Sequence, residues 1–294
     1  MLKNIANHIN ENFKITESNL EKVLCVIFSG GHLLLTDEIG TGKTTLSKII
    51  ADMLSLEFQR IQFTSDVTPG DITGFSIYNM EKNVWELHKG PVFTNVLLAD
   101  EINRAPGRTH SGLLEAMAEK QVTIDRHTYK LSENYLVIGT QNPLNEKGVF
   151  ELPLALKDRF MMNLSLNHLD EESEKNIISG LYNYQKKSSV LSEAEFINMK
   201  KEIELITVPD DVIGYTLSII KKLRNHKSVI HPASLRCGQD LVKAAKVLSM
   251  LRNDKKVLPD HIYELIDSVI SHRIITTLGS DKFSVVKDLL ENKE

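Results

Sequence analysis

Short strand-length segments alternate with amphipathic stretches through the first half of the chain. The segments "HLLLT", "EFQRIQFT", "NVLLADE", "YLVIGTQNP" and "MMNLSL" each predict a strand, and the first, third and fourth are apolar enough to be buried. Between them, "TTLSKIIADML" has apolar residues at helical spacing, and "SGLLEAMAEK" and "LPLALKDRF" also predict helices. A further helix precedes the first strand and ends at Gly30–Gly31. Strands that alternate with helices predict an α/β fold with a parallel sheet covered on both faces.

Two further segments predict β-hairpins outside this sheet. "GFSIYNM" and "VWELHK" are separated by "EKN", and "QVTIDRHTYKLS" turns at Asp125, Arg126 and His127. Trp85 in the first hairpin is either a contact for another molecule or an aromatic residue packed within the hairpin.

From "LDEESEKNIISGLY" onward the pattern predicts helices only. The acids at 170–174 suit a helix N-terminus, Pro209 and Pro259 suit helix starts, and Ser234 can cap "LRCGQDLVKAAKVLSMLR". The change of pattern predicts an α/β nucleotide-binding domain over residues 1–168 and a helical lid domain over 169–294.

Composition narrows the class of protein. The chain is 41% hydrophobic and 25% charged, which is ordinary for a globular protein with its own core. Its net charge of -4 gives no basic footprint for nucleic acid. Two cysteines, Cys25 and Cys237, are expected as buried thiols rather than a disulfide framework. Neither a signal peptide nor an apolar run of about 20 residues is apparent, so we expect no membrane span and a cytoplasmic location.

The loop "TDEIGTGKTT" follows the first strand and opens a helix. It matches the phosphate-binding pattern G-x-x-x-x-G-K-[ST], except that Asp37 stands where the first glycine is usual. Gly40 and Gly42 let backbone N–H groups face phosphate oxygens, and the helix adds its positive dipole end. Lys43 suits the β- and γ-phosphates and Thr44 suits a magnesium ion. Since aspartate tolerates unusual φ values, Asp37 weakens the match without removing it.

Polar residues follow two of the predicted strands. Asp100 and Glu101 end "VLLADE", and Asn142 ends "GTQNP". Ligands of open α/β sheets bind at the carboxyl ends of the strands. Asp100 is therefore predicted to hold magnesium, Glu101 to act as a general base for water, and Asn142 to orient that water or the γ-phosphate.

Two arginines lie further along, Arg159 in "LKDRF" and Arg236 in "PASLR". A lone arginine is most often a solvated surface charge. After a phosphate-binding loop, an arginine also suits the charge that develops on the terminal phosphate in the transition state. The residues alone leave both interpretations open.

Six segments together resemble the MoxR family of AAA+ ATPases. They are "GHLLLTDEIGTGKTT", "RIQFTSDVTPGDITG", "GPVFTNVLLADEINRAPGRTHSGLLEAM", "QVTI", "GTQNPLNEKGVFELPLALKDRF" and "PASLRCGQDLVKAAK". The similarity extends from about Gly31 to about Ile274, and "DEINRAP" followed by "LLEAM" is its most specific part. Family members often carry aspartate at the position of Asp37, so the resemblance implies a family variant of the loop rather than a lost site.

The resemblance implies a P-loop core with β-hairpin inserts and an all-α lid, with ATP and Mg²⁺ as ligands. The nucleotide contacts it implies are Glu38, Ile39, Gly40, Thr41, Gly42, Lys43, Thr44 and Thr45. The metal contacts are Thr44 and Asp100. The catalytic group comprises Glu101 of the Walker B pair, Asn142 as sensor 1, Arg159 as arginine finger and Arg236 as sensor 2.

The resemblance also implies a biological role. MoxR relatives are chaperone-like motors that form homo-oligomeric rings, with a hexamer as the expected size, and often serve a partner with a von Willebrand A domain. Two alternatives are an AAA+ motor acting on nucleic acid and a nucleotide-dependent scaffold without hydrolysis. Net acidity argues against the first, and the intact Glu101, Asn142 and arginines argue against the second.

A few residues depart from the family pattern. His110, Gly112, Leu154 and Leu156 differ from the usual residues, and "PASLR" replaces the commoner "GASPR". None removes a catalytic group. We expect these positions to lie on surfaces that face neighbouring subunits or the pore, where they would bear on the choice of partner.

Overall fold

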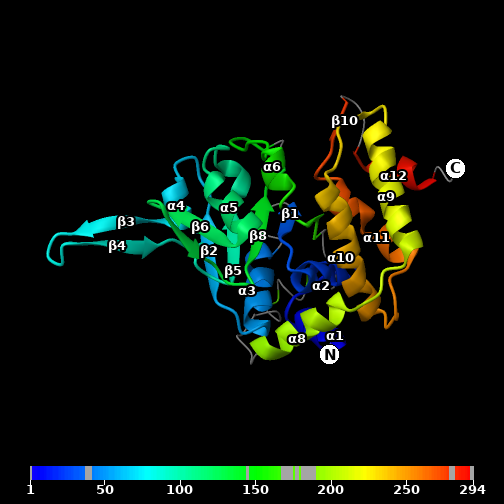
Figure 1. Cartoon of the computed structure of the whole chain (residues 1–294), viewed down its shortest axis with the longest axis horizontal. Helices are drawn as coiled ribbons and strands as arrows, with labels where there is room; N and C mark the ends of the chain where they lie inside the picture. The colour runs from blue at the N-terminus through cyan, green and yellow to red at the C-terminus, as the bar shows by residue number, and fades with distance from the viewer. Residues whose placement is uncertain are drawn as a thin grey trace.

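A five-stranded parallel sheet lies at the centre of the first half of the chain (Figure 1). The computed structural model describes residues 2–36, 42–143, 146–166, 175, 179, 190–277 and 282–291. The strand order is β2-β5-β8-β1-β9, with every neighbouring pair parallel. The strands are β1 (Leu33–Thr36), β2 (Phe58–Gln62), β5 (Val96–Asp100), β8 (Leu136–Gln141) and β9 (Met162–Leu164). The predicted parallel sheet and α/β class are confirmed.

Alternate strand residues enter two different apolar clusters, one on each face of the sheet. Leu33 and Leu35 join a cluster that reaches the N-terminal and lid helices, whereas Leu34 joins a cluster around α5 (Ser111–Glu119). This is the period of two that a strand imposes on its side chains. The other elements of this half are α3 (Lys43–Met53), α4 (Pro69–Thr73), η1 (Ile102–Arg104) and α6 (Leu154–Lys157).

Both predicted hairpins are present. They are formed by β3 (Gly74–Asn79) with β4 (Val84–Lys89), and by β6 (Gln121–Ile124) with β7 (His127–Lys130). The β3–β4 hairpin projects from the body of the protein (Figure 1). Trp85 is 71% exposed and contacts only its cross-strand neighbour Tyr78 among aromatic rings of the described residues. It is therefore not a buried hairpin aromatic.

The second half is mainly helical. Within the described residues its helices are α8 (Glu193–Glu204), α9 (Asp210–Asn225), α10 (Leu235–Leu251), α11 (Pro259–Ile270) and α12 (Lys282–Glu291). The prediction of helices only was wrong in one detail, because β10 (Val229–His231) pairs with β11 (Ile275–Thr276). Strands of two or three residues are too short to give a period in the sequence. The acids at 170–174 lie outside the described residues. The helix starts predicted at Pro209 and Pro259 are observed.

Ser234 lies at the N-cap position of α10, as predicted, but its hydroxyl does not cap the helix. It donates instead to Asp158 Oδ1 at 2.8 Å, across to the turn after α6. The side chain thus links the two halves of the chain.

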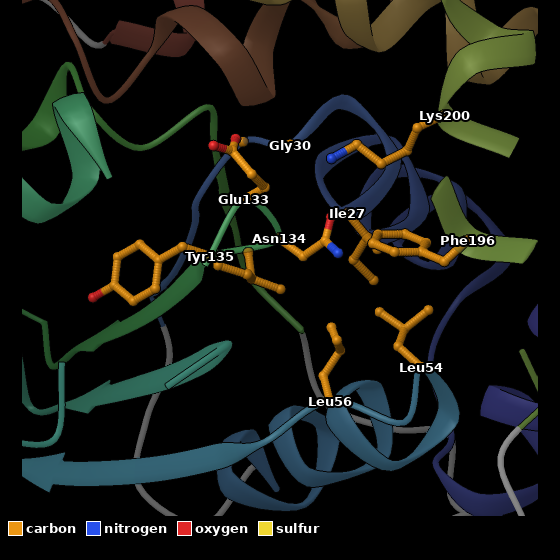
Figure 2. Close-up of a pocket in the computed structure, with 11 residues that line it drawn as sticks. Ile27, Gly30, Leu54, Leu56, Glu133, Asn134, Tyr135, Phe196 and Lys200 are labelled. Carbon is orange, nitrogen blue, oxygen red and sulfur yellow. The ribbon is translucent and has the colours of Figure 1, made fainter. Parts of the chain in front are cut away.

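Of the N-terminal helices, α2 (Glu17–Ser29) packs on α8 and α10 of the lid and on β9 of the sheet, whereas α1 (Leu2–Asn12) packs on α2 and α3. The α1 helix was not predicted, since its segment is mostly polar. Figure 2 shows Phe196 of α8 beside Ile27 of α2, near Leu54 and Leu56. The cavity there is about 10 Å³, room for one water at most, so this junction is closely packed.

Three of the four departures from the family pattern are buried, which corrects the expectation that they lie on surfaces. His110 and Leu156 are almost fully buried, Gly112 is buried and Leu154 is half-buried. A Cβ on Gly112 would approach Pro69 and Ile72 of α4, because α4 packs directly on α5. These residues shape the inside of the α/β half rather than a partner surface.

Within the described part of the chain, no helix combines the length and apolar character that a bilayer crossing requires. Cys25 and Cys237 are buried free thiols, as predicted, and burial raises the pKa of the Cys237 thiol to about 12.

Candidate functional site

A cavity of about 430 Å³ lies where three strands end and one helix begins. Parallel neighbours place their carboxyl ends at the same edge of a sheet, and β2, β5 and β8 are adjacent. The helix α3 contributes its first turn. The cavity is lined by Gly42, Lys43, Thr44, Thr45, Arg60, Gln62, Asp100, Glu101, Thr140 and Asn142. The sequence-predicted residues Lys43, Thr44, Thr45, Asp100, Glu101 and Asn142 are therefore brought together.

The start of α3 suits an anion. Gly42 has φ +80°, a conformation that favours glycine, and a Cβ there would lie 2.6 Å from the Phe13 ring. The helix begins at the next residue, Lys43, so the N–H groups of its first turn and its positive dipole end border the cavity. The predicted loop ligands Glu38, Ile39, Gly40 and Thr41 lie outside the described residues.

One hydroxyl holds the two acids in place. Thr140 Oγ1 donates to Asp100 Oδ1 at 2.6 Å, and it accepts from the backbone N–H of Glu101 at 2.8 Å. Glu101 has φ +53°, an uncommon conformation for a residue with a side chain. The bond from its N–H to Thr140 helps to hold this conformation, which directs the chain away from the sheet immediately after Asp100.

Both carboxylates face cations. Arg60 Nε and Nη2 lie 3.0 and 2.7 Å from Asp100 Oδ2, and Arg104 Nε lies 3.0 Å from Glu101 Oε2. Gln62 Nε2 also donates to Glu101 Oε2 at 3.3 Å. Partly exposed ion pairs of this kind contribute about 0–1 kcal/mol, so they can open at little cost when another cation or a phosphate enters.

Asn142 is held by a second asparagine that sequence reasoning missed. The side-chain amide of Asn142 donates to Glu101 Oε1 at 3.4 Å. Its backbone N–H donates to Asn103 Oδ1 at 3.1 Å, and Asn103 Nδ2 donates to its carbonyl at 2.9 Å. Asn103 is fully buried, so this pair fixes the end of β8 relative to η1. The resulting geometry brings Asn142 and Glu101 to one side of the cavity.

The donor set fits a nucleotide phosphate with a hard divalent cation. The Thr44 hydroxyl and the Asp100 carboxylate line the same cavity and are oxygen ligands of the kind that Mg²⁺ prefers. Lys43 and the N-terminus of α3 supply positive charge beside them. The volume is within the range of small-molecule sites, about 300–1,000 Å³.

The two predicted arginines do not line this cavity. Arg159 follows α6 and is half-buried, and its buried Nε has no hydrogen-bond partner among the described residues. Arg236 is the second residue of α10, in the first helical turn as predicted. Neither arginine reaches the cavity of its own chain in this conformation.

The role of Thr140 is open to a direct test. Thr140→Val should lower the free energy of unfolding by about 1–3 kcal/mol, because Asp100 Oδ1 and the Glu101 N–H lose a buried partner. Urea unfolding measures this change. The exposed Thr128→Val on β7 is a matched control and should change it by less than about 0.5 kcal/mol. Equal effects of the two variants would mean that Thr140 does not hold the acids.

Comparisons with known proteins agree with this geometry. Residues 32–162 match the ATPase family associated with various cellular activities (AAA), and residues 221–291 match the AAA lid domain. The protein YeaC of Bacillus subtilis, which is uncharacterized, is 37% identical over 86% of this chain and 80% of its own length. The chaperone MoxR1 of Mycobacterium tuberculosis is 32% identical over 93% of this chain and 75% of its own length. A crystal structure from Cytophaga hutchinsonii, provisionally described as an ATPase, superposes with a TM-score of 0.86 at 31% identity, covering 98% of this chain and 93% of that one.

Proposed function

Since the chain belongs to the MoxR family of AAA+ ATPases, we propose that it hydrolyses ATP with Mg²⁺ and uses the energy to remodel or activate partner proteins. The observation that carries the proposal is the meeting of Lys43, Asp100, Glu101 and Asn142 around one cavity. These residues come from three separate segments of the chain, the start of α3 and the ends of β5 and β8, and the fold brings them together.

Each residue has a role that its position supports. Lys43 and the first turn of α3 bind the phosphates, and Thr44 with Asp100 would hold the metal. Mg²⁺ bound there would neutralise charge on the phosphates. Glu101 takes a proton from the attacking water, and Asn142, bonded to Glu101, orients that water. The ion pairs of Arg60 with Asp100 and of Arg104 with Glu101 must open when substrate enters.

Arg159 and Arg236 complete the site from elsewhere. Because Arg159 does not line the cavity of its own chain, we propose that it serves as the arginine finger of a neighbouring subunit. A contact in which one subunit completes the next is head-to-tail, and such contacts close into rings. We propose a homo-oligomeric ring, with a hexamer as the expected size, and Arg236 as sensor 2 of the lid. A partner with a von Willebrand A domain is the expected class of client, and the cytoplasm is the expected compartment.

Phosphate release from ATP, measured with and without single-stranded DNA, tests this function. We expect magnesium-dependent release that DNA leaves unchanged within about twofold. Stimulation by DNA of tenfold or more would favour the alternative, a motor that acts on nucleic acid. Tight ATP binding without any release would favour a scaffold. Either result would contradict the proposal.

A further inference from the structure

Arg273, a buried arginine of the lid, hydrogen-bonds to the turn that carries Arg159. Arg273 follows α11 and is 4% exposed. Its Nη2 lies 2.6 Å from the Phe160 carbonyl oxygen, 3.3 Å from that of Met161 and 2.6 Å from Asp240 Oδ2. The neighbouring His272 Nε2 lies 2.9 Å from the same Phe160 oxygen. The carbonyl directly after Arg159 is therefore held by two side chains of the lid.

The other side of Arg159 is tied to the lid as well. Asp158 Oδ1 accepts from Ser234, the residue that precedes α10, and lies 4.0 Å from Arg273 Nη1. Phe160 is fully buried, and its ring fills the space that a side chain on Gly139 of β8 would need. The turn 158–161 is thus fixed between β8, which leads to the cavity, and the start of α10.

Arg273 also contacts the helix that carries Arg236. Asp240, the ion-pair partner of Arg273, lies four residues after Arg236 on α10, and residues at this spacing share one face of a helix. One buried side chain accordingly contacts the helix that carries Arg236 and the turn that carries Arg159.

We propose that Arg273 is a positioning residue that locks the Arg159 turn to the lid helix α10, so that the orientation of the lid sets where the Arg159 guanidinium lies. The proposal rests on the proposed function, in which Arg159 completes a neighbour's site. It adds a path by which the lid of one subunit controls hydrolysis in the next.

Stability alone gives a weak reason for this arrangement. Replacing a buried ion pair by well-packed apolar residues is often neutral or stabilising. The Arg273–Asp240 pair nevertheless spans three segments and takes up two backbone carbonyls beside Arg159. Directional bonds of this kind define an orientation, which apolar packing does less well.

The test begins with Arg273→Lys in the full chain. Lysine keeps the charge opposite Asp240 but loses the planar fork that reaches both carbonyls. We expect an ATP affinity within about twofold of wild type, measured with a fluorescent nucleotide, and phosphate release reduced at least about tenfold. Arg252→Lys is the matched control, since Arg252 also pairs with two acids, Glu21 and Glu264, but lies beyond the opposite end of α10. It should leave both values near wild type.

Mixing experiments then identify the site through which Arg273 acts. Mixed equally with Lys43→Ala, which keeps a good finger, Arg273→Lys should regain activity, because roughly a quarter of head-to-tail interfaces pair an intact loop with an intact finger. Mixed with Arg159→Ala it should regain none, because both chains then lack a working finger. A structural defect would give no recovery with Lys43→Ala, and an effect on the chain's own site would give recovery with Arg159→Ala. Either pattern would overturn the inference.

A control mixture separates this inference from the proposed function. Lys43→Ala with Arg159→Ala should recover activity if the finger acts between subunits. Recovery in this control, but not with Arg273→Lys and Lys43→Ala, refutes the inference alone. A flat control refutes the finger between subunits. In that case the single-turnover rate of ATP hydrolysis decides the inference, measured for Arg159→Ala and for the double variant that also carries Arg273→Lys. Equal rates support the inference, and a slower rate for the double variant refutes it.

Discussion

Arg159→Ala should lower the rate of ATP hydrolysis by about 10³–10⁵-fold while ATP affinity stays near wild type. The guanidinium stabilises charge that develops on the transferred phosphate, and that charge is absent from the bound ground state. Because Arg159 does not line the cavity of its own chain, its removal should leave nucleotide binding there intact. Phosphate release and nucleotide titration on the same preparation measure the two quantities.

Arg224→Ala is the control for this variant. Arg224 is an exposed arginine in the last turn of α9, and its loss should change the hydrolysis rate by less than about twofold. A parallel fall in ATP affinity and rate for Arg159→Ala would indicate a binding residue. An unchanged rate would mean that Arg159 has no catalytic role.

Glu101→Gln should lower hydrolysis by about 10²–10⁴-fold, the usual contribution of general acid–base catalysis. Glutamine keeps the shape of Glu101 and its contact with Asn142, but it cannot take a proton from water. It also removes the ion pair with Arg104. ATP binding should persist, so the variant should hold ATP and serve as bait for partner proteins. Rapid-quench measurement of ATP cleavage gives the chemical rate.

The exposed Glu81→Gln at the tip of the first hairpin is the matched control and should hydrolyse ATP like wild type. If Glu101→Gln hydrolyses ATP as fast as this control, Glu101 is not the base. If it fails to bind ATP, the carboxylate has a role in binding that its position beside Asn142 does not explain.

The sequence predicted those parts of the site that follow from local order. Asp100, Glu101 and Asn142 each end a strand, and parallel strands bring such ends to one edge. The hairpins were predictable for the same reason, since alternation and turn residues are close in the chain.

Other parts depend on contacts between distant segments, and no local pattern reports them. Thr140 reaches Asp100 across 40 positions, and Arg273 reaches Phe160 across 113. Asn103 lies within the "DEINRAP" motif, and nothing in that local pattern indicates its bonds to Asn142. Arg60 and Gln62 had one available signal: two long polar side chains at alternate positions at the end of a strand share one face.

The central claim is that this cavity hydrolyses ATP, and one comparison tests it most directly. Phosphate release is measured across a magnesium titration for wild type and for Lys43→Ala, purified side by side. The account predicts saturable release by wild type that vanishes on chelation of magnesium and is lost in Lys43→Ala, because the variant lacks the charge beside the phosphates. Release that is equal in the two proteins, or absent from wild type, would contradict it.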